Sequence, residues 1–119
     1  MNFKAELPIY LQVMDSIKRD IVTGAISPGQ KLPSVRELAL KYTINPNTAS
    51  RVYRELESES ICFTRRGMGT FVTDNEERIR RMKEEMAQEL IRQFIEGMTQ
   101  LGFTCEEAIR FIKTEKKGE

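Results

Sequence analysis

The chain has 119 residues, of which 31% are charged, yet its formal net charge at pH 7 is only +1. This length fits one domain, or one small domain with an appendage. The balanced charge excludes a protein that binds nucleic acid through a strong overall positive field, so any such partner must be held by a local basic patch.

The first predicted helix begins at Pro8, whose fixed φ angle suits the first turn of a helix. Apolar residues then recur at spacings of three and four, which predicts one buried face. Gly24 stands where a C′ residue is expected, so the helix should end there. Residues 27–32 follow and read as a turn built on a proline and a glycine.

A second, shorter helix is predicted from Ser34 to about Tyr42, because Ser34 and Glu37 have the Ser-x-x-Glu spacing of a capping box. A tight connection over residues 43–44 leads into a third helix, for which Asn45 is the expected N-cap. Two short helices joined in this way are the pattern of a helix-turn-helix.

The third predicted helix, residues 45–57, reads NPNTASRVYRELE and is amphipathic. One side is apolar, whereas the other carries amides, hydroxyls and guanidinium groups. Such groups can bond base edges and phosphates at once, which indicates a recognition helix. The alternative is a surface helix that contacts only solvent.

A β-hairpin is predicted next, with strands around residues 61–64 and 70–72 and an arginine- and glycine-bearing loop between them. We expect Phe71 to pack inward on the helices, because two isolated strands would be marginally stable. Residues 1–74 are therefore expected to form a winged helix-turn-helix, a mostly α (α+β) fold with a two-stranded wing.

Residues 75–119 are expected to form a two-helix dimerisation region, with a long helix from Glu76, a stop at Gly102 and a last helix to about Lys113. The tail is too small to bury its apolar stripe, so we expect a second subunit to cover it. The alternative is a tail that packs on its own DNA-binding domain. The stripe and predicted dimerisation residues are Ile79, Met82, Met86, Leu90, Phe94 and Met98.

Polar side chains in three places are candidates for contacts with DNA. On the third helix, Asn47 suits base reading, Thr48 suits a phosphate, and Arg51 and Arg54 suit either. Near the start of the second helix, Ser34 and Arg36 suit a phosphate clamp. In the hairpin loop, Arg65 and Arg66 suit phosphates or a minor groove, while Gly67 and Gly69 allow close approach.

The residue types present argue against an enzyme and against a metal site. The chain has no histidine, and its two cysteines, Cys62 and Cys105, form no metal-ligand spacing and no disulfide framework. Neither paired catalytic carboxylates nor a phosphate-binding glycine loop is recognisable, so we expect no catalytic residue and no cofactor. The absence of a signal peptide or a membrane-spanning run predicts a cytoplasmic protein without a membrane partner.

The sequence resembles the GntR family of bacterial transcription regulators over about residues 7–73. The similarity is carried by PIYLQVMDSIKRDIVTGAISPGQKLPS, by LPSVRELALKYTINPNTASRVYRELE and by the wing ending RRGMGTFV. The short two-helix tail and the NPNT opening resemble the YtrA subfamily, whose members lack the large effector-binding domain of other branches.

The resemblance implies a homodimer that binds an inverted-repeat operator, usually as a repressor, and subfamily members often control ABC-transporter genes. Many other branches carry arginine at the position held here by Ser50, so Arg51 is expected to replace that contact. By position, the family's DNA contacts fall on Ser34, Arg36, Asn45, Asn47, Thr48, Ser50, Arg51, Arg65, Arg66, Gly67 and Thr70.

Three alternatives remain open from the sequence. The chain could be a winged-helix module that binds a protein and has lost DNA binding. A small-molecule effector of unknown identity could bind at the dimer interface or between the tail and the DNA-binding domain. Cys62 or Cys105 could sense redox state or a metal, although isolated cysteines in apolar settings are usually core residues.

Overall fold

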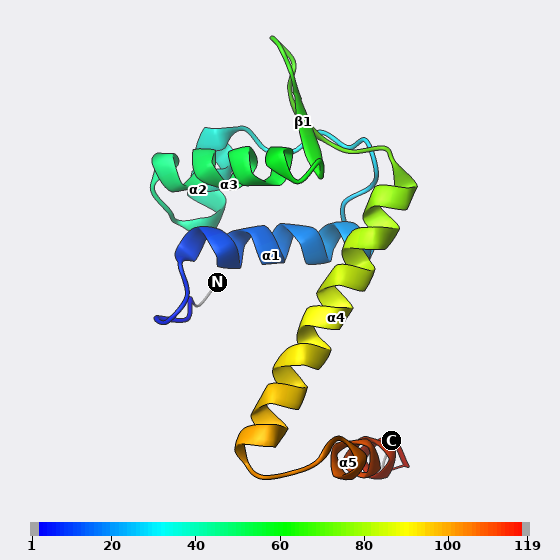
Figure 1. The fold of residues 1–119 in the computed structure, drawn as a ribbon. Helices are drawn as coiled ribbons and strands as arrows, with labels where there is room; N and C mark the ends of the chain where they lie inside the picture. The colour runs from blue at the N-terminus through cyan, green and yellow to red at the C-terminus, as the bar shows by residue number, and fades with distance from the viewer. Residues whose placement is uncertain (1–2, 118–119) are drawn as a thin grey trace. The chain divides into compact units, whose positions relative to one another are not determined.

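The computed structural model describes residues 3–117 and is mostly α-helical with a two-stranded antiparallel sheet, which confirms the predicted fold class (Figure 1). The chain separates into two compact units, one up to Met82 and one from Lys83. This division lies inside the long helix, whereas the sequence suggested a boundary after residue 74. The elements are α1 (Ile9–Val22), α2 (Val35–Tyr42), α3 (Pro46–Ser58), β1 (Cys62–Arg65), β2 (Gly69–Val72), α4 (Glu76–Gln100) and α5 (Cys105–Lys117).

Side-chain caps define where the second and third helices begin. At the start of α2, Ser34 Oγ accepts from the Glu37 backbone N–H at 3.1 Å, and Glu37 Oε1 accepts from the Ser34 N–H at 2.9 Å. At the start of α3, Asn45 Oδ1 accepts from the Asn47 N–H at 2.7 Å. These bonds satisfy N–H groups that a helix leaves unpaired, so the predicted starts of both helices are confirmed.

The core of the first unit forms where α3 packs on both α1 and α2 (Figure 1). The Tyr53 hydroxyl of α3 donates a hydrogen bond to the Pro33 carbonyl just before α2. Burial raises the pKa of Tyr53, so the hydroxyl keeps its proton for this bond. The buried apolar residues of the three helices are Val13, Met14, Ile17, Ile21, Leu38, Ala39, Tyr42, Ala49, Val52, Tyr53 and Leu56.

The hairpin of β1 and β2 turns a different face inward from the one expected. Cys62 pairs with Val72 and both are buried, whereas Phe63 pairs with Phe71 and both are only half-buried. Because neighbouring pairs in a hairpin point to opposite faces, the two phenylalanines stack on the outer side, with ring centroids 5.9 Å apart. The prediction that Phe71 packs inward is wrong, since Cys62 and Val72 occupy that side.

A third extended segment lies along β2, which the sequence had suggested was only a turn. Lys31 forms an isolated antiparallel bridge with Phe71, and the Leu32 N–H donates to the Thr70 carbonyl at 2.8 Å. The Val72 N–H donates to the Gln30 carbonyl at 2.9 Å. The segment therefore pairs the second edge of β2, which would otherwise present unsatisfied backbone groups.

The first turns of α4 are fastened to the first unit at Glu59. The Glu59 carboxylate pairs with Lys18 Nζ of α1 at 2.9 Å, and its backbone carbonyl accepts from Arg78 Nε of α4 at 2.9 Å. Met82 is 2% exposed and belongs to the core of this unit. The assignment of Met82 to the dimerisation surface is wrong, because a partner subunit cannot reach it; Ile79, also assigned there, is half-buried in the same unit.

The second unit consists of the remainder of α4, a turn at Gly102 and α5. The predicted capping box is confirmed: the Thr104 N–H donates to Glu107 Oε1 at 3.0 Å, and the Glu107 N–H donates to Thr104 Oγ1 at 3.2 Å. The helix continues to Lys117 rather than ending near Lys113. Glutamate and lysine are good helix formers, and lysines in a last turn suit the helix dipole, so the charged end extends α5.

Candidate nucleic-acid interface

The outer face of α3 presents polar side chains to solvent while its inner face is buried. Asn47, Arg51 and Arg54 are exposed, and Thr48 and Ser50 are half-buried. The helix therefore shows a continuous polar surface with both amide and guanidinium groups, as the sequence predicted. These are the side chains that recognise adenine and guanine edges in a major groove.

Asn45 lies at the N-terminal end of this face but has a structural duty as well. Its Oδ1 atom accepts the capping bond from the Asn47 N–H, so only its amide NH₂ group is available to another partner. Asn45 can therefore donate to a phosphate or a base acceptor, but it is not suited to the bidentate recognition of adenine, which also needs the amide oxygen.

Arg51 rests on an aromatic ring of another helix. Its guanidinium carbon lies 3.8 Å from the ring centroid of Tyr10 in α1, well within the range of a cation–π contact. Its Nε atom is also 4.0 Å from Glu55 Oε1, one turn further along α3. Sequence reasoning missed Tyr10, because nothing in the spacing of two distant residues indicates this contact.

The start of α2 supplies the second group of predicted contacts. The Ser34 hydroxyl oxygen accepts the capping bond, and the hydroxyl also bonds the Glu37 carboxylate, while Arg36 is exposed two residues further along the chain. The backbone hydrogen bond from Ser34 lowers the pKa of Glu37, so this carboxylate stays charged and fixed in the cap. Arg36 lines an open groove of about 460 Å³ together with Ile44 and Pro46, which places it beside the start of α3.

The hairpin carries the third group. Arg65 lies over the Phe63 and Phe71 rings, 5.4 and 5.5 Å from their centroids, so the outer aromatic pair supports a cation. Arg66 and Gly67 are exposed in the turn, where Gly67 has a φ of 78°. Thr70 is half-buried in β2.

Lys31 adds a basic side chain that the sequence did not single out. It is exposed and lies across β2 beside Gly69, where an added Cβ would come within 2.9 Å of Lys31 Cε. Its place depends on the bridge to Phe71, a long-range pairing that local sequence patterns do not indicate. The first unit therefore has basic side chains on α2, on α3 and along the hairpin.

All the predicted DNA contacts fall in the first unit, and none of them is buried. Arg36 of α2 and Pro46 of α3 line the same groove, while the hairpin carries its own cluster. The contacts are Ser34, Arg36, Asn45, Asn47, Thr48, Ser50, Arg51, Arg54, Arg65, Arg66, Gly67 and Thr70.

The second unit has an apolar groove between α4 and α5, which we call the tail groove. Its volume is about 420 Å³ and its walls are almost entirely apolar. Leu90 and Phe94 of the predicted stripe line it, whereas Met86 and Met98 are half-buried elsewhere on α4. Its lining residues are Leu90, Ile91, Phe94, Ile95, Cys105, Ala108, Ile109 and Ile112.

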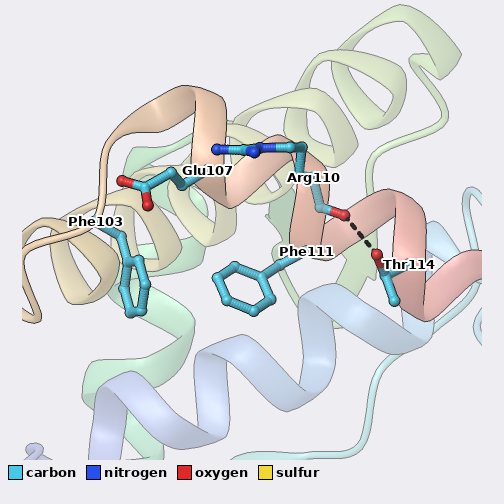
Figure 2. Close-up of a pocket in the computed structure, with 5 residues that line it drawn as sticks. All are labelled: Phe103, Glu107, Arg110, Phe111 and Thr114. Carbon is cyan, nitrogen blue, oxygen red and sulfur yellow. Dashed lines mark hydrogen bonds between the residues drawn. The ribbon is translucent and has the colours of Figure 1, made fainter.

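A second, open hollow of about 290 Å³ lies along α5. Figure 2 shows Phe103 and Phe111 facing each other across it, and their rings meet edge to face at 5.3 Å. Glu107 and Arg110 form its charged rim, and Thr114 Oγ1 donates to the Arg110 carbonyl at 3.0 Å. Glu107 is already engaged by Thr104, so the hollow offers mainly an aromatic wall.

Two findings bear on other classes of protein. Within residues 3–117, no three acidic or cysteine side chains gather in a way that could hold a metal ion. The helices in this part of the chain are all too short or too polar to cross a bilayer.

Comparisons with known proteins agree with this arrangement. Residues 9–72 match the family described as bacterial regulatory proteins, gntR family. The chain is 42% identical over 117 residues to the uncharacterized HTH-type transcriptional regulator YhcF of Bacillus subtilis, covering 98% of this chain and 97% of the relative. It is 39% identical over 111 residues to the HTH-type transcriptional repressor YtrA of the same organism, covering 92% and 85%.

Two solved structures extend the comparison to three dimensions. A GntR family transcriptional regulator from Listeria monocytogenes has a TM-score of 0.86 and 41% identity, with 94% of this chain and 98% of that chain covered. The structure of AraR(DBD) in complex with operator ORX1 has a TM-score of 0.57 and 31% identity, with 60% and 93% covered.

Proposed function

This chain belongs to the GntR family of bacterial regulatory proteins, and from this premise we propose that it represses transcription by binding an inverted-repeat operator as a homodimer. Its family is one of DNA-binding regulators, not of enzymes.

The observation that carries the proposal is the polarity of α3. Ala49, Val52 and Leu56 are fully buried, and the opposite face presents Asn47 and Arg51 to solvent. A helix fixed by its apolar side can present its polar side to a major groove without disturbing the core. The similarity to AraR(DBD), which was solved with an operator, supports the same use of this unit.

The predicted contacts divide by chemistry into two kinds. Arg36, beside the start of α2, and the wing arginines are suited to phosphates, because an arginine near helix N–H groups or on a hairpin reaches the DNA backbone. Asn47 and Arg51 are suited to bases, because amides and guanidinium groups form bidentate bonds with adenine and guanine. Affinity and specificity should therefore depend on different residues.

We propose that the tail groove is where a second copy binds. Leu90, Ile91, Ile109 and Ile112 are each about half exposed there, which is an unusually large apolar area to leave in water. Helices that present such a face bury it against an identical face in a two-fold dimer. A dimer would also match an inverted repeat, whose half-sites are related by the same symmetry.

The genes under control are proposed from the resemblance to YtrA-type regulators. We propose that they include an ABC-transporter operon and that the protein acts in the cytoplasm, where bacterial DNA lies. Electrophoretic shifts with promoters adjacent to its own gene test the gene assignment, which fails if none of them is bound.

The function itself is tested by selection from random duplex DNA with the full-length protein. The proposal predicts enrichment of an inverted repeat, with two chains on each duplex. The Arg36→Ala variant should recover the same sequence at lower yield, and Asn47→Ala should recover a degenerate one. If the wild-type protein enriches no sequence at all, the chain is not an operator-binding protein, and a winged-helix module that binds another protein becomes the better account.

A further inference from the structure

The contact between Arg51 and Tyr10 joins the recognition helix to a helix that carries none of the predicted DNA contacts. The guanidinium carbon is 3.8 Å from the ring centroid, while the Arg51 side chain remains 49% exposed. Tyr10 is half-buried in the first turn of α1, next to residues that pack into the core. One face of the guanidinium is therefore covered by protein, and its edge is open to solvent.

We propose that Tyr10 is a positioning residue for DNA recognition, holding Arg51 in the orientation in which it reads a base. This inference rests on the proposed function, in which α3 binds a major groove. Tyr10 acts through Arg51 and need not touch DNA itself. Its role would be to set specificity at the base pair that Arg51 reads.

The geometry suits this role because stacking and base recognition use different parts of a guanidinium group. A cation–π contact occupies one flat face of the group. The five N–H donors lie in the plane and point outward from its edge, so they remain free for O6 and N7 of guanine. A guanidinium held on a ring can therefore form both base bonds without leaving the ring.

Preorganisation explains why such a contact would raise affinity. A free arginine side chain has many rotamers, and fixing it on a base costs conformational entropy at the moment of binding. An arginine already resting on Tyr10 has given up part of that freedom in the free protein. The ring stays in place because α1 packs against α3 within the same compact unit.

The competing partner of Arg51 does not account for its position. Glu55 Oε1 lies 4.0 Å from Arg51 Nε, the outer limit of an ion pair, and both side chains are more than 40% exposed. Exposed pairs of this kind hold a side chain only weakly. The aromatic face is the closer and more directional contact, so it is the one that fixes the plane of the guanidinium.

The test uses the full-length protein and the duplex that the wild-type protein selects from a random library, with a shuffled duplex as reference. Tyr10→Leu removes the ring and keeps an apolar side chain, and Tyr10→Phe keeps the ring. The Tyr10→Leu change should lower the ratio of selected to shuffled affinity about two- to fivefold per subunit, or about four- to twenty-fivefold for a dimer. Tyr10→Phe should keep the wild-type ratio.

A second measurement separates positioning from general support of the fold. In an Arg51→Ala background, Tyr10→Leu should have no further effect on the ratio, because the residue that it positions is gone. An equal loss in both backgrounds, or a Tyr10→Leu ratio equal to wild type, overturns the inference. A wild-type protein that prefers no sequence overturns instead the proposed function, so the two failures are distinguishable.

Discussion

At the scale of single residues, the candidate interface contains two kinds of side chain, which differ in whether charge or orientation matters most. Arg36 and Arg66 are exposed cations, which we propose attract phosphates through their charge. Asn47 and Arg51 are proposed to read bases, which requires a defined orientation of the amide and guanidinium groups. Asn45 caps α3 through its Oδ1 atom, and its NH₂ group can still donate to a partner, whereas the Ser34 hydroxyl is engaged within its own cap.

The first prediction contrasts Arg36→Ala with Asn47→Ala. Loss of Arg36 should weaken binding to every duplex and flatten the salt dependence by about one unit of slope, because one phosphate is no longer neutralised. Loss of Asn47 should instead cost about 1–3 kcal/mol of discrimination between bases and leave binding to shuffled DNA unchanged. Fluorescence anisotropy over a salt series measures both quantities. Equal effects of the two substitutions would show that this division of roles is mistaken.

The second prediction concerns the cysteines. Burial raises the pKa of the Cys62 thiol to about 12, and the charge of Glu57 adds to the effect. The thiolate is the reactive form, so between pH 7 and pH 9 Cys62 should stay protonated and inert, whereas Cys105 is exposed. A thiol reagent at pH 8 should leave Cys62 unmodified in the folded chain and should modify it after denaturation. Rapid modification of Cys62 in the folded state would contradict this prediction and would support a sensing role for Cys62.

At the scale of elements, the helices and the hairpin could be predicted from local signals, whereas the segment that pairs with β2 and the face that the hairpin turns inward could not. The capping boxes at Ser34 and Thr104, the proline at position 8 and the glycines at 24 and 102 act within a few residues, so the sequence indicates them directly. The pairing of Lys31 with Phe71 depends on contacts far apart in the chain. The same holds for the outward turn of Phe71, which follows from the strand register.

The candidate site also has features that the sequence indicates and features that appear only in the folded structure. The polar face of α3 and the loop arginines follow from periodicity and composition, which are local. The supports of those arginines do not, because Tyr10 meets Arg51 and Phe71 meets Arg65 only once the helices and strands have packed. The sequence therefore indicated which polar residues lie on the surface of this unit but not what holds them in place.

The third prediction tests the hairpin through two glycines. Gly69 has a φ of 119°, where a side chain is strained, so Gly69→Ala should destabilise the protein by about 1–3 kcal/mol. The Lys31 side chain near the added Cβ is flexible and can move, so backbone strain is the main cause. The matched control is Gly97→Ala in α4, where an added Cβ meets nothing within 4 Å. This change should stabilise the folded protein by about 0.5–1 kcal/mol, because alanine favours a helix more than glycine does. Urea denaturation measures both, and a neutral Gly69→Ala would contradict the strain.

At the scale of the whole molecule, α4 contributes to both compact units. Its first turns belong to the DNA-binding unit, where Arg78 and Met82 hold them, and its later turns form one wall of the tail groove. A net charge of +1 cannot produce high affinity through an overall field. Affinity should therefore depend on two recognition helices held at a fixed separation in the proposed dimer, with α4 as the connection in each subunit.

The fourth prediction follows for the tail groove. Ile109→Lys places a charge in its apolar wall and should shift the protein from dimer to monomer in sedimentation at micromolar concentration. The control is Leu40→Lys, which changes an even more exposed apolar residue of the first unit and should leave the dimer intact. A dimeric Ile109→Lys variant would mean that the copies associate through another surface.

The most direct measurement is a titration of the full-length protein against its selected duplex and against a shuffled duplex of the same composition at physiological salt. The account predicts two chains on each selected duplex and an affinity at least about a thousandfold higher than for the shuffled one. Equal affinities, or a single chain on the selected duplex, would contradict the claim that paired α3 helices read an inverted repeat.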